Sequence, residues 1–180
     1  MSVTQRGFSL AEVAVAMAIS SVLLLTGARF IPALQRVTLR QTQQSALQEV
    51  VWQRLAAIAK QVQRAGYCRG DCAGDPLMIS AACLISRWDS NSNGVWEPDD
   101  DVTGFRLREG VLETRRGATD CGGSGWDKMT DPATLEVTQF QAERHASAGF
   151  APTVVLSLSA RQPAVTALFS ASTAVTGYNL

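Results

Sequence analysis

The chain has 180 residues, of which 46% are hydrophobic and only 18% are charged, a low charged share for a soluble globular protein. Its 16 basic residues balance its 16 acidic residues, so net charge gives no reason to expect nucleic acid or acidic lipid as the main partner. The length allows one domain with a core and one additional element.

The first predicted element is an apolar helix. Residues 8–28 read FSLAEVAVAMAISSVLLLTGA, a run in which the only charged residue is Glu12. About 20 apolar residues can cross a bilayer as a helix. A cleavable secretory signal has a shorter apolar core and ends in a small-residue cleavage site, and a simple anchor would not carry a carboxylate in its apolar run. A buried helix of a soluble protein would not need a leader that ends in Arg6-Gly7.

The boundary before this helix carries a specific motif. A short polar leader ends in Gly7, the apolar Phe8 follows, and Glu12 lies four residues after Phe8. This pattern resembles the class III signal of type IV pilins and of type II secretion pseudopilins. The resemblance implies that prepilin peptidase removes residues 1–7 by cutting between Gly7 and Phe8, and that the new amine of Phe8 is methylated. Gly7 has no Cβ, so its backbone can approach the peptidase closely.

The same resemblance gives Glu12 a role in assembly. It implies that Glu12 pairs with the Phe8 amine of a neighbouring subunit in the filament. A carboxylate buried among apolar helices needs such a partner. Two alternatives stay open: Glu12 pairs with the Phe8 amine of its own chain, or it lies at the level of the lipid headgroups.

The helical pattern continues beyond the apolar run. We predict a transmembrane or filament-core helix over 8–30 and an amphipathic half-helix over 31–65. Apolar residues in the second half recur at spacings of four, four, three and four, which is typical of one helix face: Leu47, Val51, Leu55, Ile58 and Val62. We interpret this stripe as core packing. Gly66 is typical of a helix C-terminus.

Residues 66–180 are predicted to form a β domain. The segments 104–108 and 111–115 alternate apolar and polar residues, and Glu109-Gly110 between them is a hairpin signal. Other extended segments are expected at 83–88, 135–143, 153–160 and 166–174. The predicted fold class is α+β, with an antiparallel sheet packed on the amphipathic half-helix. This is also the type IV pilin-like fold that the resemblance implies.

The four cysteines are Cys68, Cys72, Cys83 and Cys121. An even count in a chain that enters a membrane indicates disulfides in an oxidising compartment. A zinc site is the alternative, but only one close pair of cysteines exists, where such sites usually have two. Four cysteines allow three pairings. We favour Cys68–Cys72 with Cys83–Cys121, a short link after the helix and a link from strand to loop, while the other pairings stay open.

An acidic loop follows the segment 83–88. Residues 89–94 match D-x-[DN]-x-[DN]-G, the start of a calcium loop. The candidate ligands of a structural calcium ion are Asp89, Asn91, Asn93, Val95, Glu97 and Asp100. Asp100 takes the closing position, where an EF-hand has glutamate, and the flanking segments are not two helices. The alternative is a turn rich in Asx residues with solvated acids. No other cofactor is indicated.

No catalytic arrangement is recognisable, because the single histidine, His145, has no evident partner. We therefore expect a protein that is not an enzyme. Several later segments resemble minor pilins that are similar to the J-type minor pseudopilins of type II secretion: 63–68, 88–94, 117–119, 125–128 and 175–180. The resemblance implies a subunit that helps to initiate a type IV pilus and is incorporated at its tip.

The implied partners are prepilin peptidase, other minor pilins, the major pilin, the inner-membrane assembly platform and membrane lipid. The implied location is the inner membrane, spanned once with the C-terminal domain in the periplasm, and then the pilus tip. One alternative is a J-like pseudopilin of a type II secretion system. A second is a tip adhesin or DNA-binding module, for which Arg106, Arg108, Arg115 and Arg116 are the only hint. Nucleic acid is not expected as a partner.

Overall fold

The structure is a computed structural model that describes residues 7, 9–146, 148–163 and 165–180, with only the backbone of 165–167. Phe8, where we place the peptidase cut and the methylation, lies outside the described residues. The chain divides into two compact units, Met1–Gln44 and Ser45–Leu180. Each unit is described by itself below.

The first unit contains the beginning of the helix α1, which runs over Leu10–Arg64. The helix continues through Pro32 without a break. From Ser9 to Gln44 every residue is exposed except Gly27, which is half-buried. By length and composition, α1 is apolar enough near its N-terminus to cross a membrane. This agrees with the apolar helix predicted from the sequence.

In the second unit, α1 buries a single face. Its buried residues are Leu47, Val51, Leu55, Ile58 and Val62, so the predicted stripe is confirmed as core packing. Burial begins only at Leu47, although the amphipathic half was predicted to start at residue 31. The helix ends where Gly66 adopts the left-handed conformation, with φ +85°. A Cβ at Gly66 would collide with the backbone carbonyl of Asn179, so this position also requires glycine for space.

The β strands of the second unit form two antiparallel sheets, whereas a single sheet was predicted from the sequence. The first sheet has the order β1-β2-β3-β4-β5. Its strands are β1 Leu77–Ser80, β2 Cys83–Arg87, β3 Val102–Arg108, β4 Val111–Arg116 and β5 Asp127–Lys128. The predicted hairpin joins β3 and β4, and both Glu109 and Gly110 have positive φ, 52° and 77°. This is the conformation that two-residue hairpin turns favour.

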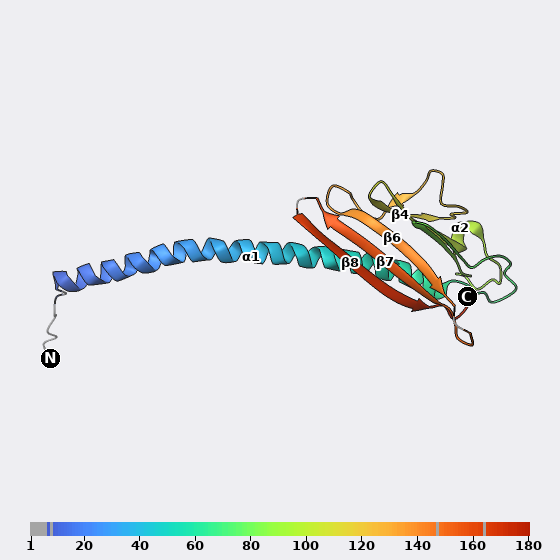
Figure 1. The fold of residues 1–180 in the computed structure, drawn as a ribbon, viewed down its shortest axis with the longest axis horizontal. Coiled ribbons are helices and arrows are strands. Elements are labelled where there is room, and N and C mark those ends of the chain that lie inside the picture. The colour runs from blue at the N-terminus through green and yellow to red at the C-terminus, as the bar shows by residue number, and fades with distance from the viewer. Residues whose placement is uncertain (1–6, 8, 147, 164) are drawn as a thin grey trace, which may run out of the picture. The chain divides into compact units, whose positions relative to one another are not determined.

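The second sheet has three strands in the order β6-β7-β8. They are β6 Glu136–His145, β7 Thr153–Gln162 and β8 Val165–Thr176. Figure 1 shows these strands lying across the second half of α1. The three extended segments predicted beyond residue 134 correspond to them. The short elements β1, β5 and α2 (Pro98–Asp101) were not predicted.

One core joins α1 to both sheets. The buried stripe of α1 packs in one cluster with Leu84, Phe105 and Leu112 of the first sheet and Phe140, Leu156 and Leu158 of the second. A smaller cluster, Cys83, Ile85, Val102 and Ala118, lies on the first sheet with Trp126 packed against it. Both faces of β2 are therefore buried, which explains why its sequence CLISR does not alternate strictly between apolar and polar residues.

Candidate functional site

The N-terminal site begins with a capped helix start. The backbone N–H of Ser9 donates to Oε2 of Glu12 at 2.9 Å, and the N–H of Ala11 donates to Oγ of Ser9 at 3.3 Å. Ser9-x-x-Glu12 is thus a capping box, in which a serine and a glutamate satisfy helix N–H groups that would otherwise lack partners. The described structure gives Glu12 this local contact. Phe8 lies outside the described residues, so both pairings of Glu12 with a Phe8 amine stay predictions.

Gly7 shows no packing reason to be glycine. A Cβ at this position would meet nothing within 4 Å, and the residue is exposed. Gly66 is the contrast, because the fold itself excludes a side chain there. Among the described residues, nothing in the fold therefore excludes a side chain at residue 7.

The apolar residues on either side of Glu12 form a surface that no other described residue covers. Leu10 is 90% exposed and Leu24 is 73% exposed. Other large apolar side chains of this segment are also exposed: Val13, Val15, Met17, Ile19, Val22, Leu23 and Leu25. Soluble monomers rarely expose so much contiguous apolar surface. Lipid or other apolar helices are the surroundings that suit it chemically.

Two disulfides stabilise the second unit. Cys68 is bonded to Cys72 and Cys83 to Cys121, with Cα–Cα distances of 6.0 and 6.1 Å. The favoured pairing is confirmed, and no cysteine remains free. The first bond lies just beyond the end of α1, and the second joins β2 to the loop after β4. Because all four sulfur atoms are in disulfides, none is available as a thiolate ligand for zinc.

The acidic loop is organised by the buried carboxylate of Asp89. Its Oδ1 accepts a hydrogen bond from the Asn93 N–H at 3.0 Å. Its Oδ2 accepts from the N–H groups of Arg69 and Gly94, at 3.0 and 2.9 Å. Asp89 therefore connects the loop to the segment that contains the Cys68–Cys72 disulfide.

A second buried carboxylate, Asp101, closes the other end of the loop. Its Oδ1 accepts from the Ser90 N–H at 2.8 Å and its Oδ2 from the Glu97 N–H at 2.9 Å. The neighbouring Asp100, which is predicted as the closing calcium ligand, is exposed. Three consecutive aspartates gave no sequence signal to separate them.

Hydrogen bonding sets the protonation of both carboxyl groups. Burial acts to raise the pKa of Asp89, but the three backbone N–H donors outweigh it and hold this pKa below its ordinary value. Burial likewise acts to raise the pKa of Asp101, and hydrogen bonds from Ser90 and Glu97 lower it to below its ordinary value. Both groups are therefore charged at neutral pH.

The remaining calcium candidates lie on the surface of this loop. Asn91 Oδ1 accepts from the Asn93 N–H and Asn93 Oδ1 from the Val95 N–H, each at 3.0 Å. Glu97 Oε2 accepts from the Asn91 side-chain amide at 3.1 Å. The two contacts that Asn91 Oδ1 and Asn93 Oδ1 accept are Asx turns, which the alternative interpretation expected. Each amide oxygen keeps a second lone pair, so the donor set is chemically able to hold calcium, and the calcium site stays a prediction.

Of the four arginines that hinted at nucleic acid, Arg106 is not available as part of an exposed basic surface. Arg106 is buried, and its Nε forms an ion pair with Oε2 of Glu113 at 2.7 Å. Its Cζ lies over the Trp126 ring, 4.3 Å from the ring centroid. Its Nη1 donates to the carbonyls of Cys121 and Gly122. Arg106 therefore holds the loop that carries Cys121. This loop contact has no recognisable sequence signal.

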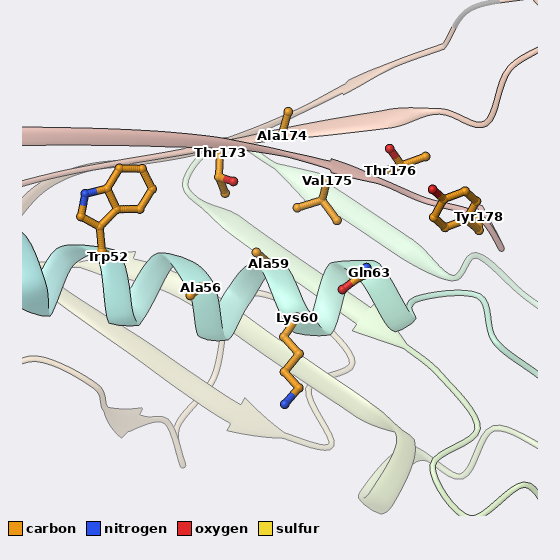
Figure 2. A pocket seen from close by; sticks show the side chains of 10 residues that line it. All are labelled: Trp52, Ala56, Ala59, Lys60, Gln63, Thr173, Ala174, Val175, Thr176 and Tyr178. Carbon is orange, nitrogen blue, oxygen red and sulfur yellow. The ribbon is translucent and has the colours of Figure 1, made fainter.

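A groove of about 580 Å³ lies between the second half of α1 and β8 (Figure 2). Trp52 and Lys60 line it from the helix, and Thr173, Val175 and Tyr178 from β8 and the residues after it. The groove contains no carboxylate, histidine or thiol. These lining residues therefore offer no pair of groups for acid–base or nucleophilic catalysis.

Comparison with known proteins agrees with these features. Residues 3–28 match the family model described as a prokaryotic N-terminal methylation motif. Residues 40–176 match the family model of prepilin peptidase-dependent protein B. The Escherichia coli K12 protein of that name is 49% identical over 187 residues, and the alignment covers 100% of both chains. No solved structure matches the chain. The chain belongs to the prepilin peptidase-dependent protein B family of type IV pilin-like proteins.

Proposed function

We propose that this pilin-like protein is a minor pilin, which helps to initiate a type IV pilus and is incorporated at or near its tip. The observation that carries the proposal is the methylation motif at residues 3–28, at the start of a helix that exposes its apolar side chains. In this proposal prepilin peptidase cuts between Gly7 and Phe8, and the Phe8 amine is methylated. The chain then joins a filament through its N-terminal helix.

The proposed location is the inner membrane, with the β domain in the periplasm before assembly. The exposed apolar helix supports a membrane anchor. The two disulfides support an oxidising compartment for the β domain. The proposed partners are prepilin peptidase, other minor pilins, the major pilin, the inner-membrane assembly platform and membrane lipid.

Glu12 is proposed to exchange partners during assembly. In the single chain it accepts a hydrogen bond from the Ser9 N–H within the first helical turn. When apolar helices surround it, we propose that its carboxylate pairs with the methylated Phe8 amine of a neighbouring subunit. Such a pair compensates the cost of removing both charges from water.

The leader assignment is tested by replacing Gly7 with tryptophan. We expect Gly7→Trp to remain uncut, because the indole blocks close approach of the peptidase. Intact-mass measurement of the membrane fraction would show residues 1–7 retained and no methyl group added. Gly27→Trp is the matched control, since a Cβ at Gly27 also meets nothing within 4 Å. Normal cutting of the Gly7 variant would contradict the assignment.

The role in assembly is tested by deleting the gene in a piliated strain. We expect far fewer pili while the major pilin is still produced, with recovery by the parent chain and not by Glu12→Ala. Unchanged piliation would contradict the minor-pilin role. If deletion instead stopped protein secretion by a type II system, the chain would be a J-like pseudopilin.

A further inference from the structure

A second cavity of the β domain is positively charged. It has a volume of about 640 Å³ and lies between the second half of α1 and the segment that follows β4. Arg54 of α1 and Lys128 of β5 contribute two cations, while Val50, Met129 and Leu135 contribute apolar walls. All of these residues belong to the unit Ser45–Leu180.

Arg54, which lines this cavity, has one polar atom without a hydrogen-bond partner. Its Nε atom is buried and has no hydrogen-bond partner among the described residues. The ion pairs found in the described part of the chain include neither Arg54 nor Lys128. A buried donor without a partner costs free energy, so such groups in native proteins usually indicate a missing ligand, ion or water.

The other polar groups of the cavity wall are already used by the chain itself. Asp131 Oδ1 accepts from the Ala133 N–H at 3.0 Å, which stabilises the turn before β6. Thr130 Oγ1 accepts from the Leu112 N–H at 3.0 Å, and Thr134 Oγ1 donates to the Asp131 carbonyl at 3.1 Å. Asp131 lines the cavity but forms no ion pair with Arg54. The cavity wall therefore carries two cations, Arg54 and Lys128, and one carboxylate, Asp131, so it is net positive.

We propose that this cavity receives an aspartate or glutamate side chain from another prepilin-like subunit. A carboxylate matches the fork of N–H groups on Arg54, and Lys128 adds a second positive charge. The apolar walls fit the methylene groups of an acidic side chain, which a free inorganic anion lacks. The choice of partner rests on the proposed function, since it takes the neighbour to be a subunit of the same assembly.

The test uses the full-length chain in membranes that contain the other prepilin-like subunits. A carbodiimide reagent joins the Lys128 amine to a carboxylate in contact with it, and mass spectrometry identifies the joined peptides. We expect a cross-link from Lys128 to an acidic residue of another subunit with its own prepilin signal. Arg54→Gln should reduce its yield about tenfold, because the main charge-assisted hydrogen bonds are lost.

Lys60→Gln is the matched control, since Lys60 lies on the same helix but lines the groove beside β8. It should leave the cross-link unchanged. Arg54→Lys should recover part of the yield, which separates loss of charge from misfolding of Arg54→Gln. The proposal would be overturned if Arg54→Gln left the cross-link yield unchanged. It would also be overturned if Lys128 were joined only to Asp131 of its own chain or to a second copy of the chain.

A small-anion site is the remaining outcome that would overturn it. In that case inorganic phosphate would raise the melting temperature of the parent and not of Arg54→Gln, and no cross-link to another subunit would form. Failure of this proposal is distinguishable from failure of the proposed function. If the cross-link is absent but deletion of the gene still reduces piliation, only the proposal of a docking cavity is refuted.

Discussion

The two parts of α1 have the same secondary structure for different physical reasons. Up to Ala28 the helix is apolar on nearly all sides, and up to Gln44 its residues are exposed apart from the half-buried Gly27, so nothing in its own unit covers it. From Leu47 onward, only one face is apolar, and that face is buried in the core of Ser45–Leu180. The second part of α1 is therefore stabilised by contacts within the domain, whereas the first part requires apolar surroundings from outside the chain.

The largest expected effect comes from deleting equal side chains in the two parts. Leu55 is 0% exposed and Leu24 is 73% exposed. Leu55→Ala should destabilise the β domain by about 2–5 kcal/mol, because it loses apolar burial and leaves a cavity. Leu24→Ala should not change the domain's unfolding. Thermal unfolding of the full-length protein in detergent measures the stability of both variants. Equal losses of stability would contradict the difference between the two parts of α1.

The two disulfides of the second unit should differ in how much they stabilise it. The Cys83–Cys121 bond joins residues that are 38 positions apart in the sequence, whereas the Cys68–Cys72 bond joins residues that are 4 positions apart. Loop-closure entropy therefore predicts about 4 kcal/mol of stabilisation for the first bond and about 2 kcal/mol for the second. Denaturant unfolding of the two double Cys→Ser variants would measure this. A larger loss from removing Cys68–Cys72 would show that the short link has a role beyond chain entropy.

Acid should weaken the second part through its buried carboxylates. Asp89 and Asp101 have pKa values below the ordinary 3.8, so their stabilisation is present above that pH and is lost as pH falls through the lowered values. Melting temperature should therefore drop below about pH 4. Asp101→Asn should lower stability at pH 7 and flatten this acid dependence. Asp100→Asn, at the exposed neighbour, should leave the pH profile unchanged.

The smallest expected effect concerns calcium at the loop that begins at Asp89. If the predicted site binds, millimolar calcium raises the melting temperature of the β domain by mass action. Asn91→Ala should abolish this increase, because it removes a predicted ligand oxygen. Magnesium is the control, since it demands a tighter octahedral site. Identical melting curves with and without calcium would leave the loop as a set of Asx turns.

Periodic patterns made much of the fold predictable. The spacing of Leu47 to Val62 identified the buried helix face, and Glu109-Gly110 identified the β3–β4 turn. The separation into two sheets was not predictable, because strand periodicity carries no information about which strands pair. The strands β1 and β5 are too short, at four and two residues, to show a period.

The candidate sites were predictable only where a local motif exists. Gly7 and Glu12 lie in a motif, and the family comparison matches that region. Asp101, Arg106 and Arg54 depend on contacts with residues distant in the sequence, such as Ser90, Cys121 and the wall around Met129. No single-sequence pattern marks such contacts, so these residues were recognised only from the structure.

The close approach of Gly66 to Asn179 has a consequence for the order of folding. The end of α1 and the residues after β8 meet in space (Figure 1) although they lie far apart in sequence. Such long-range contacts form late, because a long intervening chain must close first. During synthesis the apolar segment is made well before Asn179. In the proposed function, membrane engagement of this segment can therefore precede closure of the β domain, and the domain would complete its fold while the helix is already in the membrane.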